Sequence, residues 1–343
     1  MRDLSVFELI NKNLKTLEID EIVNLLAPLK KGMTIQSPII PSGEFLYRGR
    51  KIKDDFNKEN GIKVSDLTYP PAIKTTLGRL NRDKQPVFYC SASKEVIFFE
   101  IPDLTNGDEI ILSYWQTSER MLLNNIGYTQ FLFEKLGAKR ECPVWSVRES
   151  QQGSAHQEII SNPNSLSKEK MVKALPKEEN SAIRQALSDA FMCEIGPDEG
   201  YKYKLSTAIG ELHLGEIVGY ELQFAGVMYP TVRMWANGDN LALLLAFVDK
   251  NVEFRMAIHV CVDERSENKF SFTKVDSAIE FSEDGTLNWL GRLPNWTLGP
   301  GKGAEAVATA GRDKFGDYTI SEDGTSLHWV LTDLSTGNVI EPS

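Results

Sequence analysis

Apolar residues in the first part of the chain recur at helical spacing. Between Ile19 and Leu29 they return every three or four positions, and the segment ends at Lys30-Lys31-Gly32. Positive charge followed by glycine is typical of a helix C-terminus, so the pattern predicts a helix that covers a core. Mixed apolar periodicity predicts further helices over 126–136, 181–195 and 203–214.

Shorter apolar segments predict strands. They cover 44–50, 86–91, 109–115 and 227–230, and the apolar run from Leu241 to Val248 is interpreted as a core strand. Directly after the second of these strands, Ser93 can cap a short helix that ends at Glu100.

The pattern changes after residue 250. Apolar and polar positions alternate from Phe254 to Val262, which predicts a half-buried strand. The segment Ser-Glu-Asp-Gly-Thr occurs at 282–286 and again at 321–325, and Asp-Gly between apolar residues predicts a hairpin at each place. In contrast, the polar stretch 148–180 predicts an exposed connection with short helices.

Composition and charge narrow the classes of function. A net charge of −10 opposes binding that neutralises many phosphates, so nucleic acid is not an expected partner. The longest apolar run is too short to cross a bilayer and no signal core follows Met1, so we expect a cytoplasmic protein without a membrane span. The cysteines and histidines are scattered without ligand spacing, so no metal site is predicted.

Several separated stretches together carry a family resemblance. Tyr89 follows Arg79 by ten positions, and Glu100 ends the short helix after it. The stretches are Tyr47-Arg48, Gly78-Arg79-Leu80-Asn81, Tyr89 to Glu100, Gly226 to Arg233 and Asn240 to Leu243. In this order the chain resembles the RES domain family. Thr231 stands where that family usually has serine, and the interval from Glu100 to Thr231 is longer than its norm.

The resemblance implies an α+β fold. It would have a mixed, strongly bent β-sheet around a cleft like that of ADP-ribosyltransferases, with a helical insertion and a C-terminal β-hairpin appendage. The expected organisation is an N-terminal helical segment, 1–42, a RES-like catalytic domain, 43–250, with its insertion at about 116–200, and a β-rich extension, 251–343.

The resemblance also implies that NAD is a substrate rather than a cofactor. Arginine forks hold phosphate oxygens without losing their charge, so Arg48 and Arg79 suit the pyrophosphate. Glu100 would stabilise the positive charge that develops on the ribose, Tyr89 would stack on nicotinamide, and Thr231 would position substrate through its hydroxyl. The further expected NAD-binding residues are Tyr47, Asn81 and Arg233.

Taken singly, each of these residues is more often a surface arginine, a core tyrosine or a solvated helix end. Their combination favours an enzyme that cleaves the nicotinamide–ribose bond, either an NAD glycohydrolase or a phosphorylase. Family analogy suggests a toxin or defence effector that depletes NAD and is restrained by a separate antitoxin-like protein. The alternatives are an ADP-ribosyltransferase that modifies a macromolecule and a non-catalytic RES-like interaction module.

Overall fold

The computed structural model describes most of the chain. The described residues are 2–33, 37–53, 56, 61–143, 175–196, 198–214, 224–265 and 270–290, together with the backbone of strands at 307–309, 314–320, 327–333 and 339–340. The polar connection predicted over 148–180 lies outside them up to residue 174, and so does the second predicted turn, 321–325.

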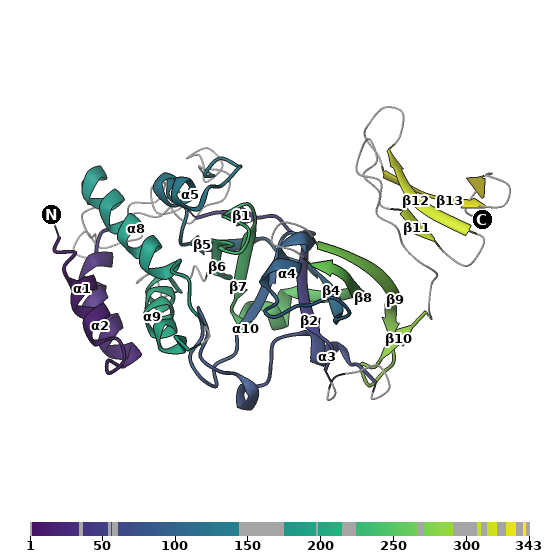
Figure 1. The fold of residues 1–343 in the computed structure, drawn as a ribbon, viewed down its shortest axis with the longest axis horizontal. Helices are drawn as coiled ribbons and strands as arrows, with labels where there is room; N and C mark the ends of the chain where they lie inside the picture. The colour runs from purple at the N-terminus through teal and green to yellow at the C-terminus, as the bar shows by residue number, and fades with distance from the viewer. Residues whose placement is uncertain are drawn as a thin grey trace, which may run out of the picture. The chain divides into compact units, whose positions relative to one another are not determined.

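The fold is α+β. Within the described residues the larger sheet is mixed and ten-stranded, in the order β1-β5-β6-β7-β3-β2-β4-β8-β9-β10 (Figure 1). Its strands are β1 (Ile39–Ile40), β2 (Phe45–Lys51), β3 (Phe88–Ser91), β4 (Glu109–Thr117), β5 (Met121–Asn125), β6 (Gly226–Pro230), β7 (Asp239–Leu243), β8 (Val252–Arg265), β9 (Phe270–Phe281) and β10 (Leu287–Trp289). Strands β5 and β6 pair in parallel, whereas β6, β7, β3 and β2 pair antiparallel in turn.

Residue contacts divide the chain into two units that are discontinuous in sequence. Unit 1 comprises Met1–Arg48, Thr68–Glu100 and Trp115–Glu253, and unit 2 comprises Gly49–Leu67, Ile101–Tyr114 and Phe254–Ser343. The division predicted from the sequence, by contrast, followed the chain in three consecutive parts.

Unit 1 contains most of the helices. They are α1 (Val6–Asn13), α2 (Ile19–Lys30), α4 (Lys94–Glu100), α5 (Gln130–Leu136), α8 (Lys177–Phe191), α9 (Tyr203–Leu214) and α10 (Leu245–Asn251), with short 3₁₀ turns η1 (Ala72–Lys74) and η4 (Gly200–Lys202). Helix α2 begins with a capping box in which the Glu18 amide donates to the Glu21 carboxylate at 2.8 Å. Its predicted extent is confirmed, as is that of α9.

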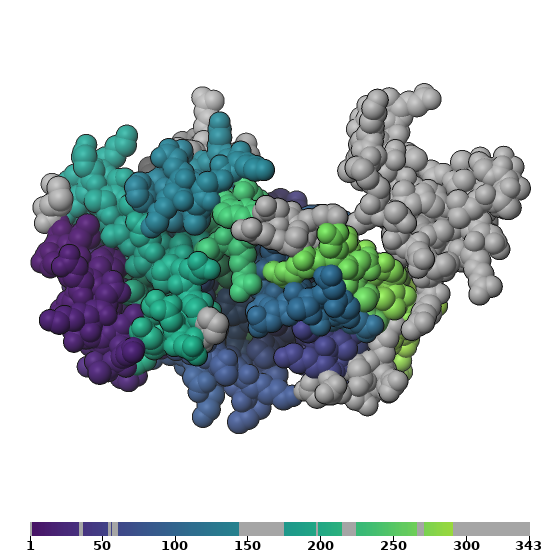
Figure 2. All heavy atoms as spheres, viewed as in Figure 1, coloured from purple at the N-terminus to yellow at the C-terminus, as the bar shows by residue number. Residues whose placement is uncertain are grey.

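The hydrophobic core of unit 1 lies where α1, α2, α8 and α9 meet strands β6 and β7. Helix α9 packs against both α2 and α8 (Figure 1), and in the space-filling view the purple N-terminal helices lie directly against the teal residues of α8 and α9 (Figure 2). The fully buried residues of this core include Ile10, Ile22, Leu26, Phe191, Ile209 and Val227. Each such side chain stabilises the fold by about 1.5–3 kcal/mol relative to an exposed one.

Three predicted elements differ in the structure. The helix predicted over 181–195 is α8, which begins at Lys177 and ends at Phe191. The run Leu241–Val248 is not one strand, since β7 ends at Leu243 and α10 begins at Leu245. A continuous apolar run does not distinguish a buried strand from a buried helix, so the division was invisible in the pattern. The helix predicted from residue 126 begins only at Gln130, because Thr129 caps it by accepting a hydrogen bond from the Leu132 amide.

Unit 2 contains the described C-terminal strands. At the first predicted turn, β9 and β10 pair antiparallel, and the Ser282 amide donates to the Thr286 carbonyl at 2.8 Å. Helix α3 (Val64–Leu67) also belongs to this unit. A separate sheet has the order β11 (Val307–Thr309), β12 (Lys314–Ile320), β13 (Leu327–Asp333) and β14 (Val339–Ile340). Among the described residues, no helix has the length and apolar character needed to cross a membrane.

Candidate functional site

The carboxylate of Glu100 lies at the C-terminal end of α4 and is held by two donors distant in sequence. Its Oε1 accepts a hydrogen bond from the Thr231 hydroxyl and another from Asn240 Nδ2 at 2.7 Å. Both donors are buried. Within the described residues Oε2 accepts no hydrogen bond, so the carboxylate has one oxygen fixed by the protein and one left to interact with a ligand. We call Glu100, Thr231 and Asn240 the Glu100 cluster.

The sheet register explains why Asn240 lies at this position. Tyr47 on β2 is opposite Ser91 on β3, Ser91 is opposite Asn240 on β7, and Asn240 is opposite Tyr229 on β6. Residues directly opposite on antiparallel strands point to the same face, so these four side chains form one row across the sheet.

Ser91 also fixes the start of α4 relative to β7. Its hydroxyl donates to the Asp239 carbonyl at 2.6 Å and accepts from the Ser93 amide at 3.0 Å. The helix that carries Glu100 is therefore tied to the strand that carries Asn240.

The turn Gly78-Arg79-Leu80-Asn81 is organised by the hydroxyl of Tyr89. This hydroxyl accepts from the Leu80 amide at 2.8 Å and donates to Asn81 Oδ1 at 2.9 Å. A side chain at Gly78 would not fit, because a Cβ there would lie 2.4 Å from Asn81 Oδ1. Burial is the main cause that raises the pKa of the Tyr89 phenol, so Tyr89 remains a neutral donor and acceptor.

Arg79 extends from this turn toward the end of α8. Its guanidinium donates to the Phe191 carbonyl and, at 3.3 Å, to the Cys193 carbonyl, and it lies 5.7 Å from the Phe191 ring centroid. A guanidinium has five N–H groups, and these bonds use two of them. Three therefore have no hydrogen-bond partner among the described residues, which leaves Arg79 able to bind an anion.

Arg48 is anchored to the backbone of two segments. Its Nε donates to the Thr68 carbonyl at 3.0 Å and a terminal nitrogen donates to the Tyr89 carbonyl at 2.8 Å. The guanidinium also lies 5.8 Å from the Phe88 ring centroid. Its positive charge opposes the rise in the pKa of the Tyr89 phenol, so Arg48 and Tyr89 interact electrostatically as well.

Tyr229 links Tyr89 and Arg79 to the Glu100 cluster. Burial is the largest cause that raises the pKa of its phenol, and the neighbouring Tyr89 and Glu100 raise it further, whereas Arg79 opposes the rise. Its ring packs edge-on against Phe191 at 5.5 Å. One tyrosine therefore interacts with the phenol, the carboxylate and the guanidinium of three of the residues singled out in the sequence.

The remaining predicted NAD-binding residues lie less centrally. Tyr47 is half-buried, and burial, followed by the carboxylates of Glu95 and Glu44, raises the pKa of its phenol. Arg233 is exposed to solvent, two positions after Thr231. In the sequence, Asn240 and Tyr229 were noted only as members of stretches that resemble the RES family. Their positions in the site follow from the strand register, which the sequence pattern does not reveal.

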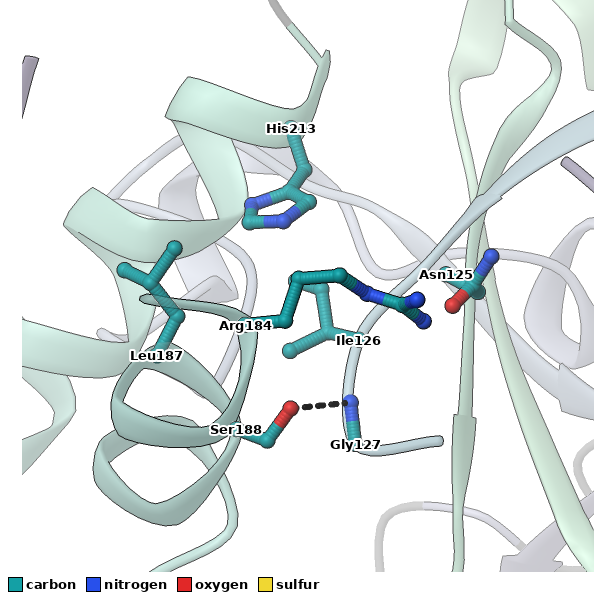
Figure 3. A pocket seen from close by; sticks show the side chains of 7 residues that line it. All are labelled: Asn125, Ile126, Gly127, Arg184, Leu187, Ser188 and His213. Carbon is teal, nitrogen blue, oxygen red and sulfur yellow. Dashed lines mark hydrogen bonds between the residues drawn. The ribbon is translucent and has the colours of Figure 1, made fainter. Parts of the chain in front are cut away.

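A second polar region of unit 1 is a small recess near the end of β5. It encloses about 10 Å³, roughly room for one water molecule, and is lined by Asn125, Ile126, Gly127, Arg184, Leu187, Ser188 and His213 (Figure 3). His213 Nδ1 lies 2.8 Å from the Ile209 carbonyl. The pKa of His213 is lowered to about 4, chiefly by burial and also by the cations Lys30 and Arg184, against the opposing effect of the Ile209 carbonyl. We call this region the His213 recess.

Within the described part of the chain, no group of three or more His, Cys, Asp or Glu side chains could hold a metal ion. A scan against protein-family models, a search of curated proteins and a search of solved structures each returned no match.

Proposed function

We propose that the protein is an NAD-consuming enzyme that cleaves the nicotinamide–ribose bond at the Glu100 cluster. The observation that supports this most strongly is the carboxylate of Glu100, of which Thr231 and Asn240 fix one oxygen, while the other accepts no hydrogen bond from the described residues. Arg79 has three N–H groups that bind nothing in the described residues, and it lies near Tyr229, as does Glu100, since both charges act on the pKa of the Tyr229 phenol.

The chemistry fits a fixed carboxylate. When the bond between ribose C1′ and the nicotinamide nitrogen breaks, its electron pair moves to the cationic pyridinium ring and neutralises it, while positive oxocarbenium character develops on the ribose. A carboxylate held in place stabilises that charge without having to reorient during the reaction. Nicotinamide leaves as a neutral molecule, so the departure needs no general acid.

Two residues, Arg79 and Tyr89, have specific roles in this proposal. Arg79 binds the pyrophosphate, because a guanidinium fork pairs well with phosphate oxygens. Tyr89 holds the turn that carries Arg79, through its hydrogen bonds to Leu80 and Asn81, and its proposed stacking on nicotinamide is a separate role. In hydrolysis, water would add to C1′ and release a proton, giving ADP-ribose.

The acceptor is identified by incubating the purified full-length chain with NAD in ¹⁸O-labelled water, with and without inorganic phosphate, and analysing the products by mass spectrometry. Hydrolysis predicts nicotinamide and ADP-ribose that carries one ¹⁸O. Phosphorolysis predicts a phosphorylated ADP-ribose, and transfer to a macromolecule predicts ADP-ribose bound to added lysate protein.

The control variant is Arg120→Gln, since Arg120 is an exposed arginine outside the Glu100 cluster. It should give the same products at the wild-type rate. If wild-type protein releases no nicotinamide under any of these conditions, the proposal of NAD cleavage is wrong, and the non-catalytic interaction module becomes the better interpretation.

A further inference from the structure

The two donors to Glu100 lie at the two ends of the connection between β6 and β7. Thr231 begins it and Asn240 follows it, so its conformation decides where the two donors lie. Two of its residues, Trp235 with φ of 49° and Ala236 with φ of 60°, are in the left-handed region, which is unfavourable for residues other than glycine. Such conformations persist only where surrounding contacts hold them.

Arg140 provides these contacts. Its Nε donates to the Ala236 carbonyl at 2.6 Å, and a terminal nitrogen donates to the Gly238 carbonyl at 3.2 Å. The same guanidinium forms a two-pronged ion pair with Asp239, with one bond of 2.7 Å. One side chain therefore binds the backbone on both sides of Asn237 and the residue next to Asn240.

Two other contacts strengthen this attachment. Asn237 Oδ1 accepts from the amides of Lys139 and Arg140, at 2.8 and 3.2 Å, and the Tyr128 hydroxyl donates to Asp239 at 2.6 Å. The guanidinium also lies 5.5 Å from the Phe133 ring centroid. A plain surface ion pair would need only the Asp239 carboxylate, whereas Arg140 also satisfies two loop carbonyls, which a lysine could not do with the same geometry.

The loop held in this way packs directly against the helix that carries Glu100. A Cβ at Gly238 would lie 2.3 Å from the Val96 side chain on α4 and 3.2 Å from that of Thr231, so only glycine permits this approach. The Thr231 amide donates to the Gly238 carbonyl at 2.9 Å, which closes the loop on itself. A shift of Gly238 would therefore move Thr231 away from Glu100.

From these contacts we infer that Arg140 is a positioning residue for bond cleavage: its guanidinium holds the loop 231–240 so that Thr231 and Asn240 orient the Glu100 carboxylate. Arg140 acts through the loop and does not contact NAD. This inference rests on the proposed NAD cleavage for its kinetic consequence, but the holding of the loop can be measured without any substrate.

The kinetic test compares Arg140→Ala and Arg140→Lys with the exposed control Arg120→Ala. Misplacement of a reacting group by about 1 Å can cost about 10²-fold in rate, so we expect kcat to fall by about 10- to 100-fold with KM within about threefold. Lysine should not restore kcat, because it lacks the planar fork. Added guanidinium ion at non-denaturing concentration should restore part of the activity of Arg140→Ala and none of that of Arg140→Lys. Unchanged kcat, or a loss confined to KM, would overturn the inference.

The substrate-independent test is amide hydrogen exchange of the folded protein. Arg140→Ala should speed exchange in 231–240 and leave α2 unchanged, and Asn237→Ala, which removes the second attachment of the loop, should do the same if Arg140→Ala fails to fold. Exchange in 231–240 equal to that of wild type would overturn the inference. If wild-type protein does not cleave NAD, the proposed function fails, and the exchange result alone decides whether Arg140 holds the loop.

Discussion

The Glu100 cluster and the His213 recess both place a titratable side chain among polar neighbours in unit 1, yet their surroundings are opposite. Glu100 receives hydrogen bonds from two neutral donors and retains one unbonded oxygen within the described residues. His213 has the cations Lys30 and Arg184 nearby, and among the described residues no carboxylate contributes to its pKa. The first arrangement suits the stabilisation of positive charge on a ligand, whereas the second keeps a buried side chain neutral.

This difference separates a chemical role from a structural one. A carboxylate with a free oxygen gains from a cationic partner, which here would be the ribose during bond cleavage. A buried imidazole whose Nδ1 lies beside the Ile209 carbonyl has a partner for that nitrogen, and the neighbouring cations disfavour its protonation. Four variants test this contrast, and their expected effects decrease in the order given.

Removing both donors to Glu100 should have the largest effect. In the double variant Thr231→Val, Asn240→Leu the carboxylate loses both hydrogen bonds that orient it, and we expect kcat to fall by about 10²–10³-fold, as for the loss of a preorganised electrostatic group. Each single variant should cost about tenfold. Steady-state kinetics measures both. If the double variant keeps the wild-type kcat, the two donors do not orient the reacting carboxylate.

The His213 recess should control how stability depends on pH. The pKa of His213 is about 4 in the folded protein against 6.5 in a free histidine, so the unfolded chain binds more protons between these values. Stability should therefore fall as pH is lowered from 6.5 to about 4. At 1.36 kcal/mol per pKa unit this amounts to about 3 kcal/mol.

His213→Gln should remove that part of the dependence, because glutamine does not titrate. Urea unfolding from neutral pH down to about 4 measures the free energy of unfolding of both proteins. If the free energy of unfolding depends on pH in the same way for variant and wild type, His213 does not contribute to the pH dependence. The description of the His213 recess would then be wrong.

Arg79→Lys should weaken NAD binding. Lysine keeps the charge but cannot bind the Phe191 and Cys193 carbonyls and a phosphate with one planar group. Hydrogen bonds to charged groups contribute about 1.5–3 kcal/mol, so kcat/KM should fall by about 10- to 100-fold, chiefly through KM. Arg120→Lys on the exposed surface is the control and should match wild type. A loss in kcat alone would place Arg79 at the reacting bond rather than at the phosphates.

Thr231→Ser should have the smallest effect. Serine keeps the hydroxyl that donates to Glu100 and removes only a methyl group, so kcat should stay within about threefold of wild type. The buried methyl contributes to packing beside Gly238, and its loss should lower stability by roughly 0.5–1.5 kcal/mol. Thermal unfolding measures the change in stability, and steady-state kinetics measures the change in kcat. A loss of activity as large as that of Thr231→Val would mean that the methyl, not the hydroxyl, is the important group.

Local sequence patterns predicted much of the fold. The spacing of apolar residues from Ile19 to Leu29 predicted α2, and the Asp-Gly turn at 282–286 predicted the β9–β10 hairpin. The division of 241–248 into β7 and α10 could not be predicted, because both parts are equally apolar.

Less of the candidate site could be predicted from the sequence. Thr231 and Glu100 were proposed separately, and the hydrogen bond between them joins positions far apart along the chain. Asn240 and Arg140 have ordinary local patterns, and their importance comes from strand register and loop packing, which are set by the tertiary fold. The family resemblance therefore proposed an acid, its arginines and Thr231, but it gave no role to Asn240 or Arg140.

The most direct test of the central claim is the single-turnover rate of nicotinamide release from NAD by wild-type protein and by Glu100→Gln, measured beside NAD affinity. Glutamine keeps the shape of glutamate and removes its charge. We expect Glu100→Gln to lower the rate by about 10²–10³-fold and to change NAD affinity by less than about threefold. Equal rates of nicotinamide release from the two folded proteins would contradict the assignment of Glu100 as the group that stabilises the ribose cation.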